Sequence, residues 1–196
     1  VEVGSQVRSV TVGTRVTNHF YLTCGQCVNC RSGRETLCLA SIGNVGQATD
    51  GGYAEYVALP ERNVIAIPDG VSDIDAAIGS DAIATPYHAC IKEAKLKPSD
   101  TVLVVGAAGG VGIHMIQMAS LCGARVLAAD LGQVKMDFIQ TIGADLLIDA
   151  AKGAIAEQVM TATNGIGVDA VIDIVGSKNS LEQSLASLAI GGRLVI

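Results

Sequence analysis

The most informative segment of this 196-residue chain is Thr101-Val-Leu-Val-Val-Gly-Ala-Ala-Gly-Gly-Val-Gly112. It continues into a helical run that ends at Leu121, a second apolar run over 125–129, and Asp130. This order predicts a strand, a glycine turn, a helix and a second strand that ends on an acid. Glycines in such a turn let a pyrophosphate approach the N–H groups at the helix start, where the macrodipole favours negative charge. We therefore interpret the stretch as a dinucleotide-binding unit.

The glycine pattern departs in one place from the usual G-x-G-x-x-G. Ala107 stands where the first glycine is expected, and a glycine lies one position earlier. The candidate cofactor-binding residues of the turn are Gly106, Gly109, Gly110, Val111 and Gly112. Asp130, 18 residues after Gly112, is placed to bind the diol of a ribose. A glycine turn needed only for close helix packing is the alternative that the pattern leaves open.

After Pro98 the chain alternates between predicted strands and predicted helices. The strands are expected near 101–106, 125–129, 145–149, 169–175 and 192–196, and the helices near 110–121, 134–142, 152–163 and 178–189. Such alternation predicts an α/β fold with a doubly wound parallel sheet in the order 3-2-1-4-5. A ligand is then expected at the carboxyl ends of strands 1 and 4, which adds Ile174, Val175 and Gly176 to the candidate cofactor-binding residues.

The first 70 residues indicate β structure with loops. Apolar or β-branched runs occur at 7–20, 52–59 and 63–67, with glycines and prolines between them. From Ser72, a plausible N-cap, the apolar residues recur at helical spacing. An interruption around 84–86 predicts two helices rather than one.

Four of the six cysteines fall within fifteen residues, as Cys24-x-x-Cys27-x-x-Cys30 and Cys38. Four soft ligands at this spacing suit a closed, structural Zn²⁺ site, because paired C-x-x-C turns direct their sulfurs inward. An iron–sulfur centre is less consistent with seven residues before the last cysteine. Another metal or oxidised thiols remain as alternatives. The other two cysteines, Cys90 and Cys122, lie on apolar helical faces and are expected to pack in the core.

The composition of the chain indicates which classes of partner it binds and in which compartment it is found. A formal net charge of −6 argues against nucleic acid and anionic membranes, which reward clustered Lys and Arg. The sequence contains no run of eighteen apolar residues and no signal peptide, and clustered cysteines without such a signal suggest a reducing, cytoplasmic compartment. The missing initiator Met and the apolar last residues suggest a piece of a longer protein.

Taken together, these motifs resemble the zinc-dependent medium-chain alcohol dehydrogenase family. The resemblance includes the cysteine spacing, the segment Asp50-Gly-Gly-Tyr-Ala-Glu-Tyr-Val57, the segment 76–88 and the glycine turn. It implies a partial GroES-like catalytic domain over residues 1–84, with a zinc lobe at about 22–43. A Rossmann-type NAD-binding domain over 85–196, incomplete at its end, would follow.

The resemblance also implies an activity: hydride transfer between NAD and an alcohol or its aldehyde or ketone, with zinc as a Lewis acid on the substrate oxygen. Asp81 matches the position of a third ligand to the catalytic zinc, whereas the residue by itself would more simply be an acid that caps or solvates a helix end. Thr85 matches a position beside the nicotinamide, and Lys135 is within reach of the adenosine ribose unless it is only a solvated lysine. Asp130 should repel a 2′-phosphate and so favour NAD over NADP.

The resemblance has a gap at the start of the chain. Residues 1–4 resemble the strand that follows the first two catalytic zinc ligands, so those ligands and the proton relay are expected upstream. Two rivals therefore stay open: a zinc-free NAD(P)H-dependent enone or quinone reductase, and a catalytically incomplete module that binds NAD and zinc. The family forms dimers and tetramers, which implies a homo-oligomer.

Overall fold

The computed structural model describes residues 2–196, without the side chains of Gln133 and Val134. By its contacts the chain divides into two compact units, Val1–Ser80 and Asp81–Ile196. The domain boundary predicted from the sequence lies at residue 84. No helix of the described residues combines the length and the apolar character that crossing a bilayer requires.

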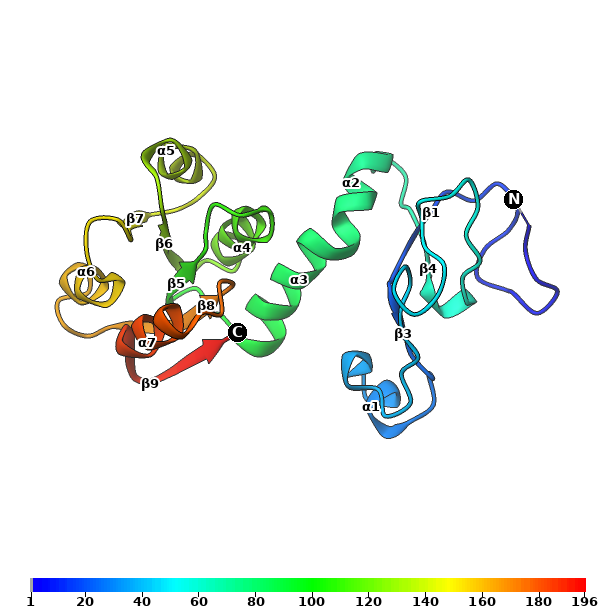
Figure 1. Ribbon diagram of the computed structural model, residues 1–196, viewed down its shortest axis with the longest axis horizontal. Coiled ribbons are helices and arrows are strands. Elements are labelled where there is room, and N and C mark those ends of the chain that lie inside the picture. Colours follow the sequence, from blue (N-terminus) through cyan, green and yellow to red (C-terminus); the bar gives the residue numbers. More distant parts are fainter. Residues whose placement is uncertain (1) are drawn as a thin grey trace. The chain divides into compact units, whose positions relative to one another are not determined.

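The second unit is built on a five-stranded parallel sheet (Figure 1). Its strands are β5 (Thr101–Val105), β6 (Arg125–Asp130), β7 (Leu146–Asp149), β8 (Val168–Asp173) and β9 (Leu188–Val195). Their order is β7-β6-β5-β8-β9, which confirms the predicted order 3-2-1-4-5. In the central strand, Leu103 pairs with Leu127 on one side and Val171 on the other.

Helices cover both faces of this sheet. The helices are α4 (Gly110–Leu121), α5 (Gln133–Thr141), α6 (Ile155–Ala162) and α7 (Lys178–Ala186). Val102 and Val104 of β5 pack in one core cluster with α4 and α5, whereas Leu103 and Val105 pack in a second cluster with α6. α7 lies beside α6 (Figure 1). Because both faces are buried, β5 is continuously apolar rather than alternating.

Residues 73–93 are helical throughout, so the predicted break into two helices is wrong. The run consists of α2 (Asp73–Ile78), a π turn η3 (Gly79–Ile83), α3 (Ala84–Tyr87) and a second π turn η4 (His88–Glu93). Pro86 lacks an N–H and its ring would clash with a carbonyl of the preceding α turn. The wider π turn that precedes α3 shifts those carbonyls, so the helix passes the proline without ending. The predicted cap is confirmed, because the N–H of Asp75 donates to Ser72 Oγ at 3.1 Å.

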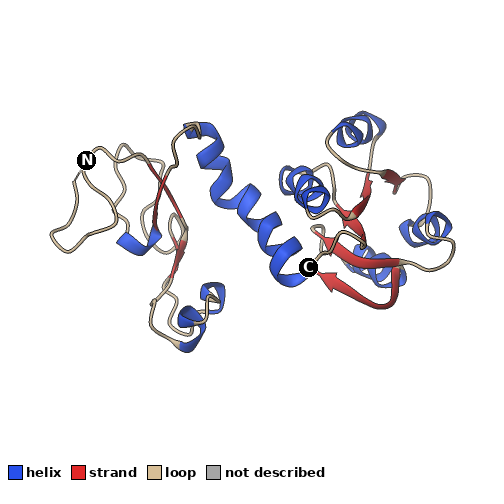
Figure 2. Cartoon of the chain, turned by 180° about the vertical axis from the view of Figure 1, so that it is seen from behind, coloured by secondary structure: helices blue, strands red, loops and turns tan. Residues whose placement is uncertain are grey.

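The first unit consists of short elements joined by long loops (Figure 2). β1 (Val16–Asn18) pairs with β4 (Val64–Ala66), and β2 (Tyr21–Leu22) pairs with β3 (Gly43–Asn44), both antiparallel. Besides α2, the unit contains the short helices α1 (Val28–Arg31), η1 (Glu35–Leu37) and η2 (Glu61–Asn63).

Two expectations for the first unit are wrong. The apolar run 52–59 is turn and coil, and of the run 7–20 only β1 is a strand. A strand needs a partner for its backbone N–H and C=O groups, and in the described part of the chain none pairs with 52–59. Tyr53, Tyr56 and Val57 of this run are exposed. Val1 lies outside the described residues, and residues 2–4 form no strand.

The core of the first unit is small. Among its described apolar residues only Leu22, Cys30 and Ala76 are buried. The buried amide of Asn63 donates to the carbonyls of His19 and Tyr21 at 2.6 and 2.8 Å. The described residues of this unit therefore bury little apolar surface among themselves.

Candidate functional site

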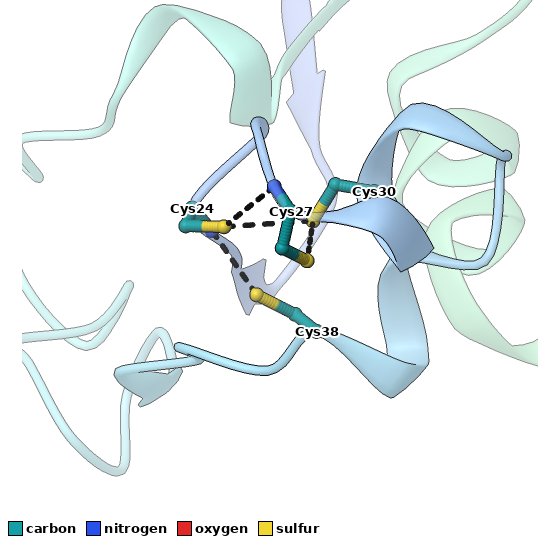
Figure 3. A group of neighbouring side chains, drawn as sticks. All are labelled: Cys24, Cys27, Cys30 and Cys38. Carbon is teal, nitrogen blue, oxygen red and sulfur yellow. Dashed lines mark hydrogen bonds between the residues drawn. The ribbon is translucent and has the colours of Figure 1, made fainter.

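The cysteine lobe brings four thiols together at one point (Figure 3). Cys24 follows β2, Cys27 precedes α1, Cys30 lies in α1, and Cys38 follows η1. Their four sulfur atoms lie within 4.8 Å of one another, and all are free thiols. The pairing of β2 with β3 joins the two ends of the lobe, which lies between them in the sequence.

The sulfur geometry fits Zn²⁺. Four Zn–S bonds of about 2.3 Å in a tetrahedron place the sulfurs roughly 3.8 Å apart. Cys27 Sγ and Cys24 Sγ lie 3.5 and 3.9 Å from Cys30 Sγ. Backbone N–H groups of Cys24 and Ala40 donate to Cys38 Sγ at 3.3 and 3.4 Å. Such N–H donors stabilise thiolates, the form in which cysteine binds a metal.

The pKa values of the cysteine thiols also favour a bound cation in the lobe. N–H groups of Gln26 and Cys27 lower the pKa of the Cys24 thiol, and those of Cys30 and Leu39 lower the pKa of Cys27 to about 6. Burial, together with the neighbouring Cys27 sulfur, raises the pKa of Cys30 to about 12. Without a metal, burial and the neighbouring Cys27 sulfur therefore both oppose ionisation of the Cys30 thiol. A divalent cation at the centre removes that conflict.

Arg62 ties the lobe to the rest of the first unit. Its guanidinium donates to the carbonyl of Thr23 at 2.8 Å. Gly25 has a φ of +71°, and a Cβ there would lie 2.7 Å from the Arg62 Cζ atom. The backbone conformation of the first C-x-x-C turn thus favours glycine, whereas the end of the exposed Arg62 side chain could move aside for a Cβ.

The glycine turn of the second unit has two positions that admit no side chain. Gly106 has a φ of +83°, and its N–H donates to the carbonyl of Ala129 at 3.0 Å. A Cβ at Gly112 would lie 2.6 Å from the carbonyl oxygen of Ala107. The other two predicted glycines differ, because a Cβ at Gly110 would meet nothing and one at Gly109 only an ordinary contact. Space therefore remains for a ligand at the start of α4.

Free backbone donors line that space. The first N–H groups of a helix, here those of Gly110, Val111 and Gly112, have no partner within it. Gly109 is the N-cap, and no side chain caps α4. This part of the turn fits a pyrophosphate.

The carboxylate of Asp130 lies against this turn. Asp130 Oδ2 accepts from the N–H of Ala108 and Oδ1 from the N–H of Leu131, both at 2.7 Å. Sequence reasoning gave this acid a ribose as partner and missed Ala108. A carboxylate has about four lone-pair sites, so two remain for a diol.

The ends of β5 and β8 meet as predicted. The N–H of Ile174 donates to the carbonyl of Val105 at 3.1 Å. A Cβ at Gly106 would lie 2.9 Å from Val175 Cγ2, so the loop 174–176 touches the glycine turn directly. Ile174 and Val175 are nevertheless 38% and 55% exposed. Two exposed apolar side chains beside the turn suit a flat organic ring.

Asp173 is the residue of this region that sequence reasoning missed. It ends β8, is 2% exposed and holds the loop 174–176 through its carboxylate. An acid directly after the apolar run Ala170-Val-Ile172 was the available signal, since buried carboxylates need partners.

The remaining predicted residues are exposed. Thr85 Oγ1 donates to Asp81 Oδ1 at 2.8 Å, one turn apart on the helix that contains η3. Lys135 is exposed on α5. In the part of the chain that the structure describes, the cysteine lobe is the only group of three or more possible metal ligands, and Asp81 is outside it. The roles of Asp81, Thr85 and Lys135 remain predictions.

Cys90 and Cys122 do not belong to a site. Cys90 is fully buried, with Sγ 3.5 Å from Met115 Sδ, and burial raises its pKa to about 12. Cys122 packs against the same core cluster. The prediction that both pack in the core is confirmed.

Family models match both units. The model described as alcohol dehydrogenase GroES-like domain matches residues 1–69, and the model described as zinc-binding dehydrogenase matches residues 110–196. The chain belongs to the zinc-dependent medium-chain dehydrogenase family. The predicted resemblance and the predicted fold, a Rossmann-type sheet preceded by part of a GroES-like domain, are confirmed.

Individual relatives in the medium-chain dehydrogenase family agree. L-threonine 3-dehydrogenase of Sinorhizobium medicae (strain WSM419) is 36% identical over 197 residues, which cover 100% of this chain and 56% of that protein. An alcohol dehydrogenase of Geobacillus stearothermophilus is 36% identical over 201 residues, covering 100% and 57%. A crystal structure of an NAD-dependent alcohol dehydrogenase is similar with a TM-score of 0.90 and 33% identity, covering 98% of this chain and 55% of that one. The chain thus spans about half the length of these relatives.

Proposed function

We propose that the protein is a zinc-dependent oxidoreductase that transfers a hydride between an alcohol, or its aldehyde or ketone, and NAD. The observation that carries the proposal is the cofactor cradle of the second unit. There the free N–H groups of α4, the carboxylate of Asp130 and the exposed side chains of Ile174 and Val175 surround one glycine turn. In a zinc-dependent dehydrogenase this cradle receives NAD.

The proposal gives each group of the cradle a task. The N–H groups of Gly110 to Gly112 bind the pyrophosphate, and Asp130 accepts from the adenosine ribose through its two remaining lone-pair sites. Lys135 supports the same ribose. The apolar side chains of Ile174 and Val175 pack against the nicotinamide side of the cofactor and keep water from it.

Asp130 is proposed to select NAD over NADP, because its negative charge repels a 2′-phosphate. We expect Asp130→Ser to weaken NADH binding about tenfold, since the bonds to the diol and to the turn at Ala108 are both lost. NADPH binding should improve relative to NADH by at least a similar factor. Fluorescence titration of each nucleotide measures both constants.

Asp130→Asn separates the two contributions of Asp130. Its amide oxygen still accepts from the N–H of Ala108, whereas the charge is lost. We expect this variant to admit NADPH while it keeps the turn intact. If the ratio of the NADH and NADPH dissociation constants is unchanged in both variants, Asp130 does not select NAD.

Asp81 and Thr85 are proposed to stand at the reacting end of the cofactor. Zinc supplies a Lewis acid for the substrate oxygen, and NAD supplies the hydride acceptor. Asp81 offers an oxygen ligand to zinc, and the bond from Thr85 Oγ1 fixes the rotamer of that carboxylate. Among the described residues, no group of possible ligands gathers around Asp81 to complete this zinc site. The activity is therefore proposed for the full-length protein.

Asp81→Ala in the full-length protein is expected to remove one zinc per chain and to lower kcat/KM about 10³-fold, since the metal contributes several kcal/mol to the transition state. NADH binding should be retained. Elemental analysis and steady-state assays with L-threonine and with simple alcohols measure these effects. Asp69→Ala, in the exposed 68–70 turn, is the matched control.

The zinc count also separates the proposal from its rivals. Two zincs per full-length chain support the dehydrogenase. A single zinc, bound by the cysteine lobe, would instead point to a protein without a catalytic zinc, such as the reductase or the incomplete module. Full activity of Asp81→Ala would contradict its assignment as a ligand.

A further inference from the structure

A buried carboxylate lies directly behind the proposed cofactor site. Asp173, the last residue of β8, is 2% exposed. Its Oδ1 accepts from the N–H groups of Val175 and Gly176 at 2.9 and 3.1 Å. These bonds fold the chain sharply after β8, and Gly176 has a φ of +61° that favours glycine.

A second element holds the same carboxylate. The hydroxyl of Ser184, on α7, donates to Asp173 Oδ2 at 3.0 Å, and Ser184 is fully buried. A buried charge is costly unless its partners are fixed. Here the partners are two backbone N–H groups of the loop and one hydroxyl of a helix, so the carboxylate joins β8, the loop and α7.

The loop 174–176 lies directly beside the glycine turn, so its conformation affects that end of the cofactor site. A Cβ at Gly106 would lie 2.9 Å from Val175 Cγ2, so the Val175 side chain occupies the space that a side chain at Gly106 would need. On the other side, the N–H of Ile174 donates to the carbonyl of Val105 at 3.1 Å. Rotation of the loop away from Asp173 therefore moves Val175 off the turn.

We propose that Asp173 and Ser184 are positioning residues for NAD: together they hold the loop 174–176 in the conformation that receives the nicotinamide end of the cofactor. This inference rests on the proposed function and deepens it. Because it is buried, the Asp173 carboxylate acts through the loop rather than on the cofactor. Its charge lets it bind both N–H groups more strongly than a neutral acceptor would.

The test is the affinity for NADH, measured from the fluorescence of the bound nucleotide at a temperature where every variant is folded. Asp173→Ala is expected to weaken binding about tenfold or more, since two charge-assisted bonds to the loop are lost. Asp173→Asn should restore most of the affinity, because its oxygen still accepts from the loop and its amide can donate to Ser184 Oγ. Ser184→Ala should weaken binding roughly threefold, since Asp173 keeps its loop bonds.

Asp145→Ala is the matched control. Asp145 Oδ2 accepts from the N–H of Val126 at 2.7 Å, which is also a bond from a carboxylate to the backbone but lies at the amino edge of the same sheet. It should lower Tm and leave the NADH dissociation constant unchanged. If Asp145→Ala weakens NADH as much as Asp173→Ala does, the effect is one of general stability and the positioning role is wrong.

Two further outcomes decide the inference. Wild-type affinity in Asp173→Ala overturns the positioning role and leaves the proposed function standing, whereas failure of the unsubstituted protein to bind NADH overturns both. If Asp173→Ala does not fold, Ser184→Ala decides, because it retains the carboxylate and both loop bonds. If Ser184→Ala binds NADH with wild-type affinity, the positioning role of Asp173 and Ser184 is wrong.

Discussion

Cys38→Ser is expected to remove the zinc of the cysteine lobe and to unfold the first unit at physiological temperature. Cys38 is the ligand farthest along the chain from the others, and its sulfur accepts N–H bonds from Cys24 and Ala40. A serine hydroxyl is a poor zinc ligand, and structural zinc contributes about 10–16 kcal/mol in small zinc-binding peptides. The first unit has few buried apolar residues to offset such a loss.

Zinc content by elemental analysis and the Tm of the unit measure this effect. We expect one zinc fewer per chain. The free energy of unfolding should fall by about several kcal/mol, which lowers the Tm of the unit by roughly tens of degrees. Cys122→Ser makes the same chemical change outside the lobe and should retain all zinc. A Cys38→Ser protein with a full complement of zinc would rule out the four-sulfur site.

Gly112→Ala is expected to abolish NADH binding and to destabilise the second unit by about 3 kcal/mol. The added Cβ would lie 2.6 and 2.7 Å from the carbonyl oxygen and carbon of Ala107. These are backbone atoms of the turn, which cannot rotate away as a side chain can. To make room, the turn and α4 must separate, and the N–H groups that bind the pyrophosphate separate with them.

Gly110→Ala is the control for folding, because its Cβ would meet nothing and alanine is about 1 kcal/mol better than glycine in a helix. The control should be as stable as the wild type or more so. Denaturant unfolding and NADH titration measure the two effects separately. A Gly112→Ala protein that binds NADH as the wild type does would refute the close approach of α4 to the turn.

These two substitutions act on different units by different physics. The first unit has a small apolar core and is expected to rely on metal–sulfur bonds, whereas the second has two extensive core clusters and relies on close packing. A chelator should therefore unfold the first unit selectively. Loss of packing at the turn should leave the zinc lobe unchanged.

The strand order and the cysteine cluster could both be predicted from the amino-acid sequence. Strand order follows from the alternation of apolar runs with helical runs, because parallel strands need right-handed crossovers. The cluster follows from spacing, since Cys24, Cys27 and Cys30 are too close in the chain to lie far apart in space. The cysteine cluster is a local property of the chain, whereas the predicted strand order also depends on the glycine turn after the first strand, which is typical of the dinucleotide-binding fold.

The groups that support the site, and the apolar runs that become strands, are known only from contacts between residues far apart in the chain. The bond from Ala108 to Asp130 and that from Ser184 to Asp173 join residues on different elements. The run 52–59 has β-forming residues but no partner in the described chain, and the wide turn of η3 carries the helix past Pro86. Partners of this kind depend on three-dimensional packing, which no local pattern in the sequence encodes.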